Sequence, residues 1–210
     1  MMGERPAPWG HHGGTAAEGA QGDTGAVQAS VSVAATCGLE PRARAQLAAE
    51  ATAMVEQVLG GDACVALGGG EGGEGGLDGW RVRVDVVLAS LDGGAFECAL
   101  LAAVGALKDA RVPSLEGGEE ATVPLPLASV PLALGFALHA ESGQVLTDPD
   151  LFEEGLAGLR VRVVVDAASS DGDVLALDVT GGTGATGDML RQCVSAAKQR
   201  AQELASSALS

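Results

Sequence analysis

The stretch from Trp80 to Pro113 reads WRVRVDVVLASLDGGAFECALLAAVGALKDARVP and predicts a strand, a turn and a helix in that order. Apolar and charged residues alternate over 80–88, which is the two-residue period of a strand with one buried face. Asp92 precedes two glycines and is the candidate cap of the helix that follows. The helix is expected to bury one apolar stripe, formed by Phe96, Leu100, Ala103, Val104 and Leu107.

The alternating pattern of strands and the apolar stripe of helices both recur before and after this stretch. Alternation over 27–33 predicts a strand, and the apolar face of 42–59 predicts an amphipathic helix. Further strands are predicted at 130–138, 144–147, 159–166 and 174–179, with a hairpin turn at Asp171 and Gly172 and a last helix from about Asp188. This order predicts an α+β fold, a two-layer sandwich of mixed β-sheet and helices.

Composition sets the expected domain limits. Residues 1–25 are rich in Gly and Ala and are expected to form a disordered tail, followed by one domain over 26–210. The segment 68–79, GGGEGGEGGLDG, contains eight glycines and is expected to be a flexible loop within that domain, because it cannot bury apolar surface.

The charge balance restricts the classes of function. The 210 residues include 12 Lys and Arg against 28 Asp and Glu, a formal net charge of -16. Such a chain repels phosphate backbones on average, which argues against an autonomous nucleic-acid binder. Any contact with RNA is therefore expected to be local or arranged by partner proteins.

The sequence indicates an intracellular protein. Its longest apolar stretch, 128–138, is shorter than the roughly 20 residues that a membrane helix needs, and 1–24 lacks the apolar segment of a signal peptide. The four cysteines, Cys37, Cys64, Cys98 and Cys193, lie far apart and form no CxxC pair. They are expected to be reduced and buried.

Two segments are candidates for chemistry. The loop Gly181, Gly182, Thr183 and Gly184 precedes the last helix and could hold a phosphate, but it lacks the GK[ST] ending of a nucleotide loop. Asp188 would also oppose an anion there, so a structural strand-to-helix turn is the preferred interpretation.

The second candidate is the acidic cluster of TDPDLFEE, which holds Asp148, Asp150, Glu153 and Glu154. Grouped carboxylates can bind a divalent metal or act as acid and base, and the alternative is a capped, solvated turn. The three histidines and four cysteines show no spacing of a metal quartet or a nucleophilic pair. No cofactor or metal is predicted.

Three segments in order resemble the ribonuclease PH-like domains of the RNA exosome and of polynucleotide phosphorylase. They are Trp80 to Pro113, VLTDPDLFEEGLAG at 145–158, and GGTGATGDMLRQCVSAAKQRAQEL at 181–204. The resemblance extends from about Val27 to the end of the chain. Ahead of Val27 the family has further strands and an R-x-D-G-R-like start that this chain lacks, so we expect a truncated or unusually short version of the domain.

The acidic segment indicates which branch of the family the chain resembles. Active members carry a D-L-x-x-x-E-D phrase whose last Asp serves phosphorolysis, with arginines that hold phosphate and RNA. Here Pro149 follows Asp148, Glu153 and Glu154 form the acidic pair, and no arginine cluster is apparent. This form is similar to non-catalytic exosome ring subunits of the type called ribosomal RNA-processing protein forty-three.

The resemblance implies a catalytically inert subunit that scaffolds 3′→5′ RNA processing and degradation, including rRNA maturation and mRNA turnover. Its implied partners are other ribonuclease PH-like ring subunits, RNA-binding cap proteins and RNA in the ring channel, in the nucleus, nucleolus and cytoplasm. The alternative is an active phosphorolytic 3′→5′ exoribonuclease that uses Asp148, Glu153 or Glu154 with phosphate near 181–187.

Overall fold

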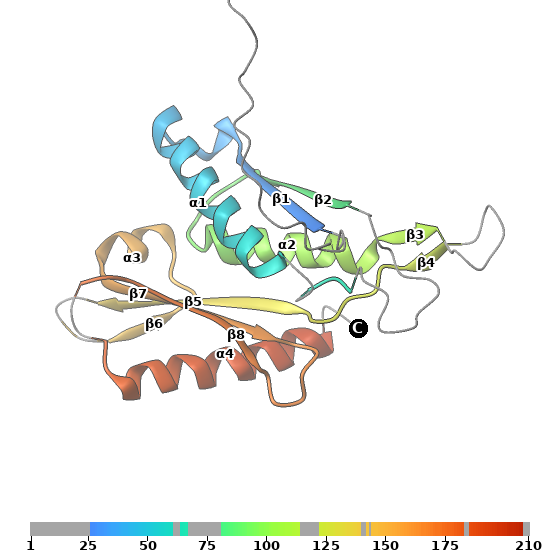
Figure 1. Ribbon diagram of the computed structural model, residues 1–210. Helices are drawn as coiled ribbons and strands as arrows, with labels where there is room; N and C mark the ends of the chain where they lie inside the picture. Colours follow the sequence, from blue (N-terminus) through green and yellow to red (C-terminus); the bar gives the residue numbers. More distant parts are fainter. Residues whose placement is uncertain are drawn as a thin grey trace, which may run out of the picture.

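Two main sheets and two layers of helices alternate in the computed structural model (Figure 1). The structure describes residues 26–60, 64–66, 81–113, 122–139, 142, 144–182 and 185–207. The first sheet pairs β1 with β2, and the second has the strand order β6-β5-β7-β8. Helices α1 and α2 lie between the sheets, while α4 covers the far face of the second sheet (Figure 1).

The helices and strands have the following bounds. The strands are β1 (Ala26–Val33), β2 (Arg81–Leu88), β3 (Arg111–Pro113), β4 (Thr122–Pro124), β5 (Pro131–His139), β6 (Val145–Thr147), β7 (Ala157–Asp166) and β8 (Val174–Gly181). The helices are α1 (Pro41–Leu59), α2 (Ala95–Asp109), α3 (Leu151–Leu156) and α4 (Gly187–Ser207), with a 3₁₀ turn at Ala35–Cys37.

Pairing differs between the two main sheets. Strands β1 and β2 run parallel, with Val31 opposite Val86. In the second sheet β5 pairs antiparallel with β6 and β7, and β7 pairs antiparallel with β8. The chain crosses from β1 to β2 through α1, as a parallel pair requires, whereas β7 and β8 are joined by the short 167–173 turn.

Helix α2 can approach the second sheet closely because β5 alternates large and small residues. The small residues Ala133, Gly135 and Ala137 alternate with leucines and Phe136 along the strand. Ala133 packs with the core that contains α2, whereas Leu132 and Phe136 belong to the core beneath α4. The larger side chains therefore fill the α4 side, and the smaller ones leave room for α2.

The α+β sandwich is confirmed, and it occurs as two stacked pairs of sheet and helix layers. The predicted α2 stripe is confirmed as well, since all five of its members are buried. The β3–β4 pair and α3 are short elements that periodicity did not predict. The predicted tail at 1–25 and the loop at 68–79 lie outside the described residues.

The cysteine prediction is correct only in part. Cys64 and Cys193 are buried thiols, and burial raises the pKa of Cys64 to about 11. Cys98 is exposed and Cys37 is half-buried, so two of the four thiols are not in a core. Among the described helices, none combines the length and the apolar character that a membrane crossing needs.

Adjacent leucines of α2 provide a test of this core. Leu100 is fully buried and Leu101 is 40% exposed. The change Leu100→Asp should lower the free energy of unfolding by more than about 3 kcal/mol, because it places a carboxylate among apolar side chains. Leu101→Asp should cost less than about 1 kcal/mol. Urea unfolding of both variants measures this, and equal midpoints would contradict the assigned burial.

Candidate functional site

The turn at 92–94 brings the start of α2 against the backbone before α3. Gly93 and Gly94 have positive φ angles of 90° and 55°. A side chain at Gly93 would come within 2.4 Å of the Pro149 carbonyl oxygen, so only glycine fits this approach. The cap residue of α2 is Gly94, which has no side chain to cap with. The prediction that Asp92 caps this helix is therefore wrong, because two left-handed residues separate it from the helix.

Two carboxylates of the acidic cluster cap α3. Asp150 is the N-cap residue, and its Oδ1 accepts a hydrogen bond of 2.8 Å from the backbone N–H of Glu153. In return the Glu153 carboxylate accepts a 3.0 Å bond from the Asp150 N–H. This reciprocal pair is a capping box, so the alternative of a capped turn applies to these two residues.

Glu154 joins α3 to the start of α2. Its Oε1 accepts a 2.8 Å hydrogen bond from the backbone N–H of Gly94, and its Oε2 lies 3.7 Å from Arg160. The side chain is 20% exposed. This contact satisfies one of the four N–H groups that the start of α2 leaves without a helical partner, and its negative charge suits that end of the helix.

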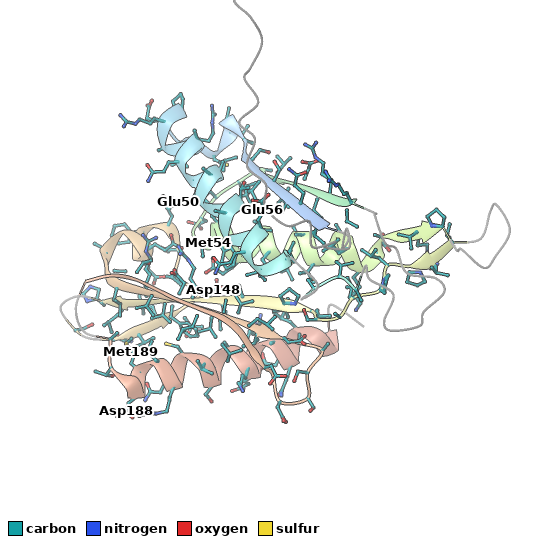
Figure 2. All side chains as sticks on the ribbon, in the orientation of Figure 1. Glu50, Met54, Glu56, Asp148, Asp188 and Met189 are labelled. Carbon is teal, nitrogen blue, oxygen red and sulfur yellow. The ribbon has the colours of Figure 1, made fainter. Side chains whose placement is uncertain are left out.

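Asp148 is held by its backbone. It is the one described non-glycine residue with positive φ, at 54°, and its N–H donates a 2.9 Å hydrogen bond to the Gly135 carbonyl. Its carboxylate is near enough to Gly94 that a Cβ there would lie 3.9 Å from Oδ1. Figure 2 labels Asp148 close to the second sheet, where its N–H meets β5.

Two arginines on β7 extend this cluster. Arg160 and Arg162 alternate with buried valines, so both lie on the face of β7 that looks toward α2. Arg162 reaches Asp178 of β8 at 3.1 Å and Glu97 of α2 at 3.7 Å. The expectation that no arginine cluster accompanies the carboxylates is therefore wrong, because the sheet places two arginines beside them.

Glu97 is the most enclosed carboxylate of this group. Burial raises its pKa above the usual 4.5; its own backbone hydrogen bond and Arg162 oppose the shift, whereas Glu154 and Asp148 add to it. Its Oε1 would lie 2.7 Å from a Cβ at position 135, which explains why a glycine faces it. Glu97 and both arginines were missed in the sequence, although the R-V-R-V-V-V alternation marks the arginines as sharing one face.

The described part of the glycine loop, Gly181 and Gly182, lies at the end of β8 beside Gly158 of β7. Gly181 has a φ of 112°, and a Cβ there would approach the Gly158 carbonyl to 2.7 Å. Thr183 and Gly184 lie outside the described residues. Thr186 Oγ1 accepts the Met189 N–H at 3.2 Å, and Asp188 pairs with Arg191. Figure 2 labels Asp188 and Met189 at the start of α4, away from Asp148.

No group of three or more His, Cys, Asp or Glu in the described part of the chain could hold a metal ion. His139 Nδ1 receives the backbone N–H of Ser142 at 3.3 Å, and His11 and His12 lie outside that part. Three carboxylates of the acidic cluster thus have partners within the chain, because Asp150 and Glu153 accept backbone N–H groups and Glu154 accepts the Gly94 N–H and lies near Arg160.

Comparison with known sequences finds exosome components. No protein-family model matches the chain. It is 30% identical over 125 residues to the exosome complex component Rrp42 of Methanocella arvoryzae, covering 60% of this chain and 46% of that protein. It is also 30% identical over 135 residues to the exosome complex component RRP45B of Arabidopsis thaliana, covering 58% and 30%. The chain spans about half the length of the archaeal relatives it matches.

Comparison with solved structures finds the same fold. An archaeal exosome core superposes with a TM-score of 0.65 at 20% identity, covering 90% of this chain and 70% of that one. A chain from the Archaeoglobus fulgidus exosome with RNA bound to the active site also scores 0.65, at 18% identity with 90% and 72% covered. Rice Rrp46 scores 0.61 at 14% identity, with 92% and 78% covered.

These likenesses confirm the predicted resemblance to exosome subunits of the ribonuclease PH-like family and confirm the fold. The sequence relatives carry the names Rrp42, RRP45B and RRP45, whereas Rrp46 is a neighbour in fold. The finer assignment to the ribosomal RNA-processing protein forty-three type stays a prediction.

The capping assignments can be tested with two aspartates. Asp150→Ala removes the N-cap acceptor of α3 and should lower the free energy of unfolding by about 1 kcal/mol. Asp92→Ala removes no cap and should change it by less than about 0.5 kcal/mol. Thermal unfolding of both variants measures the difference, and the reverse order of losses would restore Asp92 as the cap.

The raised pKa of Glu97 predicts a dependence of stability on pH. Between the ordinary value of 4.5 and the raised value, the folded chain keeps a proton that the unfolded chain has lost. The contribution of Glu97 is therefore present below that window and falls as the pH rises through it. Glu97→Gln cannot titrate, so its unfolding free energy should decline less with pH than that of the wild type. Parallel profiles from denaturant unfolding at several pH values would contradict this.

Proposed function

We propose that this chain is a catalytically inert subunit of the exosome core ring, where it scaffolds 3′→5′ RNA processing and degradation. The observation that carries the proposal is the use of the acidic cluster. Asp150 and Glu153 close the capping box of α3, and Glu154 accepts the Gly94 N–H. A general acid or base must instead aim at substrate, so these bonds favour a structural role.

The arginines beside the cluster support the same proposal. Arg162 is engaged by Asp178 and Glu97, and Arg160 lies near Glu154. A phosphate would have to compete with these carboxylates for both guanidinium groups. The alternative, an active phosphorolytic exoribonuclease, needs at least one such cation directed to the anion.

The proposed partners follow from the net charge of the chain and from its similarity to exosome proteins. With a net charge of -16, the chain is suited to contacts with less acidic proteins rather than with RNA alone. Its relatives are named exosome complex components, and one structural neighbour is an exosome with RNA bound to the active site. We therefore propose other ring subunits and RNA-binding cap proteins as partners, RNA in the ring channel, and nuclear, nucleolar and cytoplasmic locations.

The double change Glu153→Gln and Glu154→Gln tests the inert role. Each Gln keeps an oxygen that can accept the backbone N–H, so the fold should survive. RNA degradation by the reconstituted ring should remain unchanged, with and without inorganic phosphate. Loss of a catalytic acid or base instead typically lowers the rate by about 10²- to 10⁴-fold.

Equal incorporation of mutant and wild-type subunits is the required control, because an unassembled mutant would mimic lost catalysis. With incorporation matched, a hundredfold fall in phosphate-dependent release of nucleoside diphosphates would overturn the inert role and favour the phosphorolytic alternative. Recovery of the wild-type chain only as a monomer, without other ring subunits, would overturn the ring assignment itself.

A further inference from the structure

Strand β8 forms one edge of the second sheet and carries an apolar surface. Leu175, Leu177 and Val179 are each 41–46% exposed. Leu177 and Val179 stand opposite the buried Val163 and Val161 of β7, so they project on the side of the sheet that α4 covers. Helix α4 lies against β5 and β7, and it leaves these two residues less than half exposed but not buried.

The backbone of β8 is also open on its outer side. The Gly182 N–H donates to the Gly158 carbonyl at 2.8 Å, in the same register as the 160–180 pair. Hydrogen-bonded pairs alternate in an antiparallel ladder, so Leu177 and Val179 direct their N–H and C=O groups away from β7. No other described strand pairs with that edge.

The usual protections of an edge strand are weak here. The sequence VLALDVTG contains no Lys and no Pro, and its single charge, Asp178, is paired with Arg162 at 3.1 Å. The one irregularity of pairing occurs at the start of the strand, between Val164 and Val165 of β7, and the pairs from Leu177 to Gly181 are regular. Such an edge is a template for a further strand.

A groove runs between this edge and α1. It has a volume of about 540 Å³, and its apolar lining includes Met54 and Val58 of α1 and Ala176 of β8. Figure 2 labels Glu50 and Met54 on α1, above the second sheet. Side chains alternate between the two faces of a strand. A strand added beside β8 would therefore direct every second side chain into the groove. The others would cover Leu177 and Val179.

We propose that β8 accepts a strand from another, less acidic protein chain, with alternating apolar residues and a Lys or Arg that reaches the groove. If the proposed function holds, the chain that supplies the strand is a neighbouring ring subunit. This identification of the partner rests on that function. Addition of a strand to an open sheet edge is an established mode of recognition, in which the backbone supplies affinity and the alternating pockets supply specificity.

The charges around the groove identify a basic partner. Glu50 and Asp178 line it, and Glu97 and Glu154 lie behind it. Within the described part of the chain, the guanidinium groups of the groove are those of Arg160 and Arg162. Both arginines already face carboxylates of this chain. Glu50 is exposed, and its described partner is the uncharged Gln46. A second copy of this chain, also of charge -16, would be repelled at such a rim.

Three variants of the full chain test the β8 surface. Val179→Pro removes an outward N–H that β7 does not use, so the sheet should stay intact while an added strand is blocked. Leu177→Lys alters the apolar face of β8 without removing a backbone N–H. It replaces the proline variant as the test if that variant fails to fold. Phe152→Lys is the matched control, because Phe152 is 73% exposed on α3, away from β8.

The first measurement uses a fluorescent, acetylated eight-residue peptide of alternating Val and Lys, followed by fluorescence anisotropy. Val179→Pro and Leu177→Lys should each weaken binding at least tenfold, and Phe152→Lys should leave it unchanged. A peptide with Glu in place of Lys should not bind. Equal affinity for the wild type and Val179→Pro, or equal binding of the Glu peptide, would overturn the proposal.

The second measurement is co-expression with the ribonuclease PH-like ring subunits of the same genome, followed by size-exclusion chromatography. Entry of the wild type but not of Val179→Pro into the ring supports the proposal. Entry of both overturns the role of β8 and leaves the ring assignment standing. If neither enters while the peptide result holds, the ring assignment fails and the β8 surface stands. A dimer of this chain alone that Val179→Pro abolishes would assign the surface to a second copy and overturn the basic partner.

Discussion

Burial of β7 on both faces is the constraint on which the rest of the structure depends. Val161, Val163 and Val165 pack beneath α4, while Val164 joins the core formed with α1, α2 and the first sheet. A strand covered on both sides can carry charge only where partners are supplied. Arg160 and Arg162 meet that condition through carboxylates from α2, α3 and β8.

The carboxylates near 148–154 are best understood through that constraint. The close contact of Gly93 with Pro149 and the bond from Gly94 to Glu154 fix α3 against the start of α2. Glu97 comes from the same helix to reach Arg162. Carboxylates held in this way stabilise the junction of three elements.

The two edge strands of the second sheet differ in length and in apolar exposure, and this difference bears on assembly. At one edge β6 is a strand of three residues, whereas at the other β8 has eight residues and open apolar side chains. The groove under α1 adjoins the longer edge. Exposed apolar surface beside an open strand edge is typical of sites where another protein binds, and among the described residues β8 combines the two.

Local patterns determined the elements, and tertiary packing decided the site. The α2 stripe, the alternation of β1 and β2 and the last helix follow from the periods of 3.6 and 2 residues, because those periods reflect which face is buried. Glu97 and Arg162 are 65 positions apart, and Glu154 and Gly94 are 60 apart. The exposure of Leu177 depends on what α4 leaves uncovered. No local period records such contacts, so only the folded chain shows that Asp150, Glu153 and Glu154 are bonded to backbone N–H groups of the chain itself.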